Sequence, residues 1–420
     1  MDTKRLRWLA GSVAAGVVVA VGTAALTTGA ADATSGHQRA KSVIFINGDG
    51  MSAAHREAAR LALQGLDGRL AMDSLSYSGQ LTTSPHDPKS AITDSAAAAT
   101  AWATGQKTYN GAISVDVNKK PLTTLGQQAK KAGKATGLVT TAQVTDASPA
   151  AWFSQTADRG QQDDIARQYL QVTKPDVILG GGEDWWLPAG TPGAFPDKPA
   201  EDPTEASKGT KGNLIEEAKK DGYTYVTSAS QLKAAKSGKL LGLFSNEEMF
   251  QQKEEGKGDV YKPVVPLADM TTKALSTLSN DKDGFFLFVE EEGIDEFSHE
   301  NNGTQMLKSM AELEKAVKVA KAYVNEHPDT LLVITGDHDC GGATVEAAED
   351  TEDESGDGIS KEDGPFAIAG SPHKFTIDWT TSGHTGVNVP VTASGPYASS
   401  FTGEHANTYV HEVLSKILTK

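Results

Sequence analysis

The chain has 420 residues, enough for one large α/β domain or two ordinary ones, and its 38% hydrophobic content is adequate for a sizeable core. A formal charge of −16 excludes the basic character of nucleic-acid-binding proteins and argues against a stable membrane partner. The single cysteine, Cys340, excludes an internal disulfide.

Residues 1–33 have the pattern of a signal peptide. Basic residues between Lys4 and Arg7 precede an apolar run from Trp8 to Leu26, and Ala31-Asp32-Ala33 has the small-x-small form of a signal peptidase site. We expect cleavage after Ala33 and a secreted or extracytoplasmic protein. An uncleaved anchor is the alternative, because the run is near the lower limit for spanning a bilayer. Cleavage leaves 36 basic and 53 acidic residues, a charge of −17, so local cations must offset the repulsion of an anionic substrate.

Short apolar runs alternate with helical patterns along the rest of the chain. Strands are expected at Val43–Ile46, Gly137–Thr141, Val177–Leu179, Phe285–Val289, Leu331–Ile334 and Val387–Ala393. Helices are expected at Ser52–Leu63, Ala96–Ala103, Leu122–Ala132, Leu307–Val324 and His405–Ile417. This alternation predicts an α/β fold with a central, mostly parallel sheet and helices on both faces, whose ligands lie at the carboxyl ends of the strands.

Two segments interrupt the pattern. Residues 188–205 are rich in Pro, Gly and charge, and residues 346–364 are dominated by Asp, Glu and Gly. We interpret both as surface insertions in one catalytic domain that covers residues 34–420.

Polar residues that can bind metal follow several of the predicted strands. Asp49 lies in a glycine-rich turn after the first strand, although an aspartate there can also serve only as a turn former. Asp337 and His338 follow Leu331–Ile334 in another such turn, and His384 precedes the last strand. Mixed His and Asp ligands suit zinc, whereas carboxylates with a hydroxyl suit magnesium.

The segment after Phe285–Val289 is crowded with negative charge. Six carboxylates fall within eleven residues, from Glu290 to Glu300, and they repel one another unless cations neutralise some of them. Asp295 and His299 are four residues apart, so on a helical turn they can share one cation. A solvated acidic loop is the alternative interpretation.

Ser95 precedes a run of four alanines, which are strong helix formers. It therefore falls at or beside a helix N-terminus, where free backbone N–H groups attract an anion. Spacing alone also allows Asp94 or Ser95 to be only the helix cap. The sequence offers no convincing histidine base beside this serine, so its activation as a nucleophile would require a metal.

Taken together, these motifs resemble the alkaline phosphatase family across nearly the whole mature chain. The family's motifs occur in family order at Gly48–Met51, Asp94–Ala101, Thr104–Gly111, Glu290 with Asp295 and His299, Asp337-His338, and His384–Gly386. The resemblance implies a three-layer α/β sandwich and a secreted phosphomonoesterase, which hydrolyses small phosphate monoesters to alcohol and inorganic phosphate through a phosphoserine at Ser95. It does not indicate an oligomeric state.

The resemblance also implies the cofactors, two Zn²⁺ and one Mg²⁺, and their ligands. One zinc would be held by Asp295, His299 and His384, and the other by Asp49, Asp337 and His338. Magnesium would take Asp49, Glu290 and Ser148, a position where the family commonly has Thr. Arg159, thirteen residues after Asp146, falls at the family's phosphate-binding arginine, and a guanidinium can grip two phosphate oxygens. Asp146 and Glu296 complete the expected substrate-binding group.

Two residues depart from the family pattern. Glu296 stands where several members have Lys or His, and it could weaken phosphate binding, speed product release or recruit another cation. Cys340, two residues after His338, could be a buried structural thiol, a soft metal ligand or inert.

Other functions remain open at the level of sequence. A phosphodiesterase or nucleotide pyrophosphatase of the same superfamily would share the fold and the two-metal site, but usually has a Thr nucleophile. A sulfatase would need Cys or Ser followed by x-Pro-x-Arg, which is absent around Ser95. A non-catalytic cation-binding protein would hold metal only in the acidic stretch Glu346–Glu362.

Overall fold

A computed structural model describes residues 40–420 apart from 237, 254–256 and 349–360. Contacts divide the chain into Met1–His37 and a compact unit, Gln38–Lys420, which contains every described residue. The expected signal peptide lies outside the described residues. None of the helices in the described part of the chain has both the length and the apolar character that crossing a bilayer requires.

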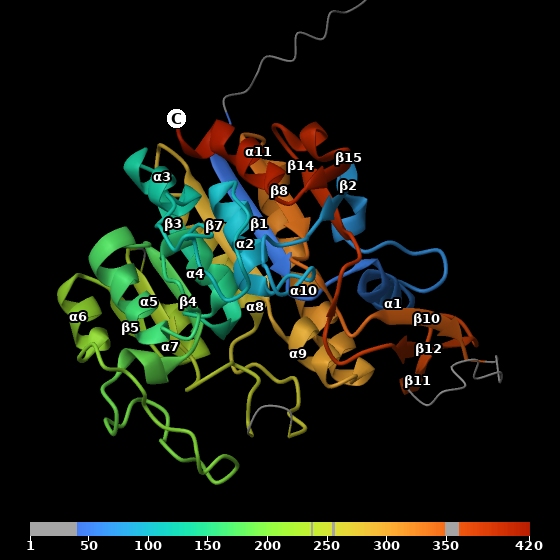
Figure 1. Cartoon of the computed structure of the whole chain (residues 1–420), viewed down its shortest axis with the longest axis horizontal. Coiled ribbons are helices and arrows are strands. Elements are labelled where there is room, and N and C mark those ends of the chain that lie inside the picture. Colours follow the sequence, from blue (N-terminus) through green and yellow to red (C-terminus); the bar gives the residue numbers. More distant parts are fainter. Residues whose placement is uncertain (1–39, 237, 254–256, 349–360) are drawn as a thin grey trace, which may run out of the picture. The chain divides into compact units, whose positions relative to one another are not determined.

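The centre of the unit is a ten-stranded, mostly parallel sheet, as the sequence predicts (Figure 1). Its spatial order is β15 (Gly403–Ala406), β2 (Tyr77–Thr82), β14 (Val389–Ser394), β8 (Thr330–Thr335), β1 (Ser42–Gly48), β7 (Phe285–Glu291), β3 (Ala135–Gln143), β4 (Val177–Gly181), β6 (Leu240–Leu243) and β5 (Thr224–Val226). From β8 to β5 all neighbours are parallel. β14 runs antiparallel to β8 and β2, and β15 is parallel to β2.

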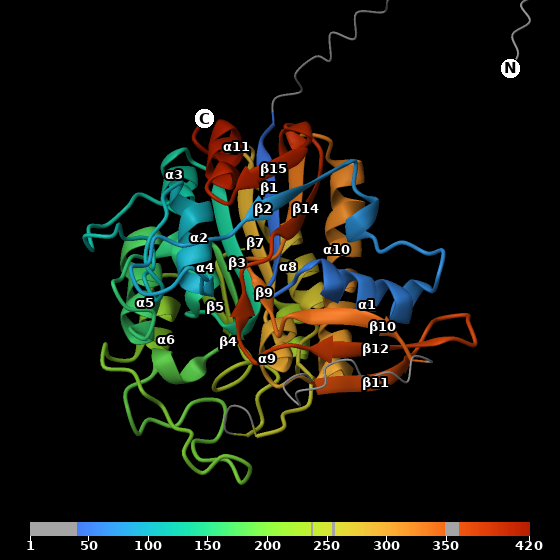
Figure 2. The ribbon, with the colours of Figure 1, turned by 45° about the vertical axis from the view of Figure 1, so that its right-hand side comes forward.

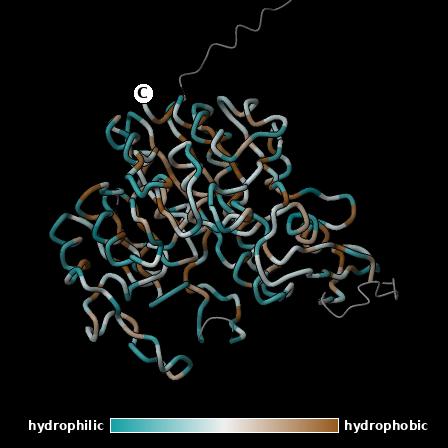
Figure 3. Tube along the Cα trace, viewed as in Figure 1, coloured by the Kyte–Doolittle hydropathy of each residue, from teal (hydrophilic) through white to brown (hydrophobic). Residues whose placement is uncertain are grey.

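Alternation along the central strands builds two cores, one on each face of the sheet. Val43 and Phe45 of β1 belong to one core, and Ile44 and Ile46 belong to the other. All four are fully buried. Apolar residues are concentrated along these central strands, while the outer loops are mainly hydrophilic (Figure 3). The continuous apolar run is thus explained by burial of both faces of a parallel strand.

Helices cover both faces. One face carries α2 (Ser95–Thr104), α3 (Leu125–Lys131), α4 (Ala147–Phe153), α5 (Gln162–Gln168), α6 (Leu214–Lys220) and α11 (Tyr409–Leu418). The other carries α1 (Ala53–Gln64), α7 (Ala229–Ala234), α8 (Leu267–Leu278), α9 (Gly293–His299) and α10 (Gly303–Glu326). Single turns are η1 (Met72–Ser74), η2 (Tyr169–Thr173), η3 (Glu183–Trp186) and η4 (Ala398–Phe401).

Two small sheets complete the fold (Figure 2). An antiparallel sheet is formed by β10 (Ala343–Ala347), β12 (Lys374–Trp379) and β11 (Lys361–Ala367), so both ends of the expected insertion 346–364 are strands. A second ribbon pairs β9 (Asp339–Cys340) with β13 (His384–Thr385) and places Cys340 opposite His384. In the other expected insertion, 188–205, Asp202 and Glu205 are buried, so it is not solvated throughout.

Some predicted boundaries are wrong. The helix expected at His405–Ile417 begins only at Tyr409, because His405 pairs with Leu81 in the sheet. The helix expected from Leu122 begins at Leu125, because the Thr124 hydroxyl caps it by accepting a hydrogen bond from the Gln127 N–H.

Candidate active site

The candidate site lies at the carboxyl ends of β1, β3, β7 and β8. Asp49 follows β1, Glu290 is the second-to-last residue of β7, and Asp337 and His338 follow β8. Ser148 is in α4, which follows β3. Because these strands are parallel neighbours, their carboxyl ends meet at one edge of the sheet and bring residues from distant parts of the chain together.

Ser95 is the first residue of α2, and Asp94 is the helix cap. The Asp94 carboxylate accepts a hydrogen bond of 2.9 Å from the Ala97 N–H, which leaves the Ser95 hydroxyl available for other contacts. Its Oγ lies 3.1 Å from Nε2 of His338. The fold brings this imidazole to the serine from 243 residues away, and it belongs to one of the expected metal ligands, His338.

A first group of possible metal ligands consists of Asp49, Asp337 and His338, all buried. His338 Nε2 is 3.1 Å from Asp337 Oδ2 and 3.6 Å from Asp49 Oδ1. Within the described residues, neither of these two carboxylate oxygens has a hydrogen-bond partner. Burial, together with the nearby Asp295 carboxylate, raises the pKa of Asp337 to about 7. Without a cation these buried carboxyls thus favour the protonated form, and a bound cation would favour their ionised form, which is the environment of a cation site.

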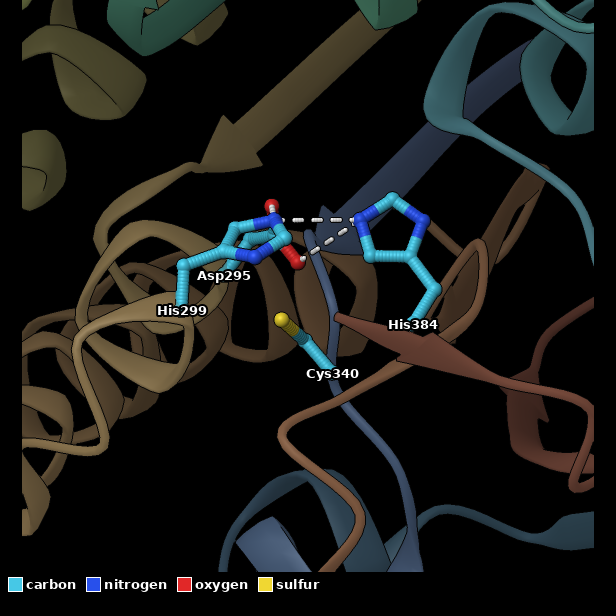
Figure 4. Close-up of side chains that lie close together, drawn as sticks. All are labelled: Asp295, His299, Cys340 and His384. Carbon is cyan, nitrogen blue, oxygen red and sulfur yellow. Dashed lines mark hydrogen bonds and ion pairs between the residues drawn. The ribbon is translucent and has the colours of Figure 1, made fainter. Parts of the chain in front are cut away.

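A second group contains Asp295, His299, His384 and Cys340 (Figure 4). Asp295 and His299 come from one face of α9, as their spacing predicts, with 3.1 Å between Asp295 Oδ2 and His299 Nε2. The Asp295 Oδ1 atom lies 3.7 Å from His384 Nε2 and is buried without a hydrogen-bond partner among the described residues. The two imidazole Nε2 atoms are 3.2 Å apart.

Backbone carbonyls orient both imidazoles. Nδ1 of His299 lies 2.6 Å from the Ser382 carbonyl oxygen, and Nδ1 of His384 lies 2.9 Å from that of Thr93. This network assigns the proton to Nδ1 in each neutral ring and directs each Nε2 lone pair toward the other histidine. Two lone pairs and a carboxylate that point at one place suit a tetrahedral zinc ion.

Cys340 is buried beside this second group (Figure 4). Burial and the adjacent Asp295 carboxylate raise the pKa of its thiol, so the free thiol is strongly favoured over thiolate. The structure therefore supports a structural thiol, within reach of the possible metal ligands.

A third group surrounds the other side of Asp49. Ser148 Oγ donates a hydrogen bond of 3.3 Å to Asp49 Oδ2. Glu290 accepts hydrogen bonds from the Asn47 amide (3.2 Å) and the Thr140 hydroxyl (2.7 Å). Burial nevertheless raises the pKa of Glu290 to about 8. Oxygen ligands of this kind suit magnesium.

Glu292 joins this third group and was not predicted. Its carboxylate lies close to those of Asp49 and Glu290, and its buried Oε2 has no hydrogen-bond partner within the described residues. A signal was present in the sequence, because residues two apart at the end of a strand point to the same side. Glu291, between them, points away and accepts a hydrogen bond from the Tyr261 hydroxyl.

Arg159 lies beside the first and third groups and is held by two aspartates. Its Nη2 donates to both carboxylate oxygens of Asp146, at 3.0 and 3.1 Å, and its Nη1 is 3.6 Å from Asp94 Oδ2. The side chain is 34% exposed and lines a cavity, so an anion that enters the cavity can meet it. Asp146, expected in the substrate-binding group, contacts Arg159 in this structure and orients it.

Comparisons with known proteins point to one family. The model of the family described as alkaline phosphatase matches residues 40–353. The chain belongs to the alkaline phosphatase family. Alkaline phosphatase 3 of Bacillus subtilis is 33% identical, over 90% of this chain and 89% of its own. Streptomycin-6-phosphate phosphatase of Streptomyces griseus is also 33% identical, over 96% of both chains. The crystal structure of a cold-active alkaline phosphatase from Shewanella sp. is 30% identical, with a TM-score of 0.72 over 90% of this chain and all of that one.

The chain is thus a phosphatase, and its family supports phosphomonoesterase activity. Glu296, where this phosphatase departs from the family pattern, lines a cavity of about 250 Å³ together with Asp146 and Arg159. Its carboxylate also lies close to those of Glu292 and Asp295. Glu296 therefore faces the candidate site, and it brings negative charge to the side on which Arg159 lies.

Proposed function

We propose that this phosphatase hydrolyses phosphate monoesters through a covalent phosphoserine at Ser95. The observation that carries the proposal is the position of the Ser95 hydroxyl, which lies at a helix N-terminus and 3.1 Å from His338, a member of a buried cluster of possible metal ligands. Free N–H groups at the start of α2 attract the phosphoryl anion, while Arg159 can grip two of its oxygens.

We further propose that the enzyme depends on metal ions, and the residues present fit them. The buried oxygens Asp49 Oδ1, Asp295 Oδ1 and Asp337 Oδ2 have no hydrogen-bond partner in the described part of the chain, which supports cation binding. One zinc would be held by Asp295, His299 and His384, and the other by Asp49, Asp337 and His338; magnesium would be held by Asp49, Ser148 and Glu290. When bound, these cations stabilise negative charge on the serine oxygen, on the phosphoryl group and on the leaving oxygen.

The residues of the chain then act in two displacements. Ser95 Oγ attacks phosphorus and gives up its proton to solvent. The bond from phosphorus to the alcohol oxygen breaks, and the leaving oxygen takes a proton from solvent to become the alcohol. Arg159, oriented by Asp146, holds the phosphoryl oxygens during the transfer. Water then attacks the phosphoserine on phosphorus, which releases inorganic phosphate and restores the Ser95 hydroxyl.

Small phosphate monoesters are the proposed substrates. The name of the Streptomyces griseus relative supports this class and makes streptomycin 6-phosphate a reasonable assay substrate. We also propose that the mature chain, residues 34–420, acts outside the cytoplasm after removal of the signal peptide.

The direct test is to trap the covalent intermediate. The enzyme is incubated with isotopically labelled phosphate at acidic pH, quenched and digested, and the peptide that contains Ser95 is examined by mass spectrometry. Labelled phosphate on Ser95 is expected. Hydrolysis that proceeds with no label on this peptide, and that persists in Ser95→Ala, would refute the proposed intermediate.

A further inference from the structure

A further cluster of carboxylates lies outside the candidate active site. Asp184, Asp197 and Glu205 each place one carboxylate oxygen within 4.8 Å of the others. Asp184 is in η3, which follows β4, whereas Asp197 and Glu205 belong to the insertion 188–205. The ligand groups around Asp49 and Asp295 are made of other residues. The cluster thus joins the insertion to the end of β4.

Buried oxygens of this cluster lack hydrogen-bond partners. Asp184 is 1% exposed and Glu205 is 5% exposed. Over the residues that the structure describes, neither Oδ2 of Asp184 nor Oε1 of Glu205 has a hydrogen-bond partner. A buried acceptor of this kind costs free energy unless a donor or a cation reaches it. Two such acceptors in one cluster therefore point to a ligand that supplies positive charge.

Asn246, which follows β6, holds Glu205 in position. Its amide Nδ2 donates hydrogen bonds of 2.6 Å to Glu205 Oε2 and 3.0 Å to the Pro196 carbonyl oxygen. These two bonds determine which end of the amide is the nitrogen. The other end, Oδ1, is buried and has no hydrogen-bond partner in the described part of the chain. The amide therefore orients one carboxylate and leaves an unused oxygen beside the cluster.

One ammonium group compensates for part of the negative charge. Burial lowers the pKa of Lys208, but its ion pair with Glu247 and the nearby carboxylates of Asp184 and Glu205 raise it overall. The single charge of Lys208 is thus shared among three carboxylates, and Asp197 adds a fourth. Negative charge is left over at the cluster.

A proton shared between two carboxyl groups is the alternative to a cation. Burial and the adjacent Glu205 carboxylate raise the pKa of Asp184 to about 9, so without metal this carboxyl keeps a proton at neutral pH. One proton forms one hydrogen bond, whereas the cluster offers three carboxylates and the amide oxygen of Asn246 lies beside it. A divalent cation can use several of these oxygens at once and would displace the proton.

We propose that this cluster is a calcium site, which fastens the insertion 188–205 to the segments that follow β4 and β6. Its donors are all oxygens, and such a set selects hard cations. Calcium accepts about six to eight oxygen ligands in irregular geometry, whereas magnesium requires a nearly ideal octahedron. Two of the three carboxylates come from a segment without helix or strand, which suits calcium better. The site is independent of the metals proposed for catalysis.

Calcium binding to the metal-loaded enzyme tests this proposal. The protein is loaded with zinc and kept in excess magnesium before calcium is added, so that these ions occupy their own sites. We expect isothermal titration calorimetry to detect calcium binding, and the midpoint of thermal unfolding to rise by about 2 to 5 °C. Asp184→Asn and Glu205→Gln should each weaken the calcium affinity by at least about tenfold and remove most of the thermal shift.

Glu201→Gln is the matched control, because Glu201 is exposed in the same insertion and lies outside the cluster. This variant should keep the calcium affinity and the thermal shift. If the two buried changes prevent folding, Asp197→Asn at a partly exposed position takes their place and should weaken calcium binding in the same way.

Two results would overturn the proposal. Absence of calcium binding in excess magnesium would leave the shared proton as the explanation of the cluster. Calcium binding that Asp184→Asn, Glu205→Gln and Asp197→Asn retain in full would place the ion elsewhere in the molecule. Neither result bears on the phosphatase function, which is measured separately by hydrolysis of an aryl phosphate.

Discussion

Nε2 of His299 and Nε2 of His384 face each other at 3.2 Å, while a backbone carbonyl lies beside Nδ1 of each ring. Two neutral imidazoles in this arrangement direct lone pairs at each other, so the contact is favourable only if a proton or a cation lies between them. The Asp295 carboxylate favours positive charge at this place. Although burial opposes it, the hydrogen bond and charge of Asp295 raise the pKa of His299 to about 9, so a proton can occupy the place in the metal-free protein and a metal cation would replace it.

Replacement of either histidine should therefore remove one metal ion. We expect His299→Ala and His384→Ala to lower zinc content by about one equivalent per chain and to reduce kcat/KM by at least about a hundredfold. Elemental analysis of dialysed protein gives the zinc content. His405→Ala, outside the ligand groups, should retain both zinc and activity. Full zinc content in His299→Ala would show that this group does not bind the metal.

Loss of the nucleophile should separate chemistry from metal binding. In Ser95→Ala we expect hydrolysis of an aryl phosphate to fall by at least about a thousandfold, because the covalent route is removed. Metal content and thermal stability should stay near those of the unaltered protein, since Asp94 and not Ser95 caps α2. Retained turnover at the original rate would show that Ser95 is not the nucleophile.

The metal-free protein should become less stable as pH rises from about 6.5 to about 8. Burial raises the pKa of Glu290 to about 8 and that of Asp337 to about 7. In this window the folded chain still holds protons that an unfolded carboxyl, with a pKa of about 4, has already released. Each such group then costs the folded state about 1.4 kcal/mol per pH unit while it remains protonated.

Thermal unfolding with and without chelator measures this effect. Zinc and magnesium should remove most of the decline, because bound cations keep the carboxylates ionised in the folded state. Glu290→Gln in chelator should show a smaller decline than the unaltered chain. A chelated protein that gains stability between pH 6.5 and 8 would contradict the assignment of protonated, buried carboxyls.

Much of this fold follows from sequence because its central strands are buried on both faces. Continuous apolar runs such as Val43–Ile46 and Leu331–Ile334 can only be covered by helices on two sides. By contrast, β2 (Tyr77–Thr82) is largely exposed, and β9 and β13 have two residues each. Such strands lack a hydrophobic pattern of their own, and pairing with distant partners determines them.

Some residues of the candidate site also follow from sequence motifs, whereas others depend on how the chain packs. Motifs after the strands identified Asp49, Asp337 and His338, because the carboxyl ends of parallel strands meet. The direct contact between His338 and Ser95 could not be read from the motifs alone, since it depends on how α2 packs above the sheet. Glu292 was also missed, because a crowded acidic segment does not show which carboxylates point inward.

Removal of the Arg159 guanidinium should weaken phosphate binding. We expect Arg159→Ala to lower kcat/KM for an aryl phosphate by about 10- to 100-fold. A loss of about this size is usual when a charged bidentate hydrogen bond is removed. Arg159→Lys should recover the charge but only part of the activity, because an ammonium cannot form two parallel hydrogen bonds. Unchanged inhibition by inorganic phosphate in Arg159→Ala would place the guanidinium outside the phosphate site.

Reversal of charge at Glu296 should tighten binding of inorganic phosphate. This carboxylate shares a cavity with Arg159, so Glu296→Lys replaces a repulsive charge by an attractive one on the same wall. We expect the inhibition constant for phosphate to fall several-fold, with a smaller decrease in Glu296→Gln, which only removes the negative charge. Tighter phosphate should also slow product release and lower kcat at saturating substrate. Glu412→Lys, on the exposed side of α11, controls for the change in net charge. Equal phosphate inhibition in Glu296→Lys and the unaltered enzyme would show that Glu296 does not influence the bound anion.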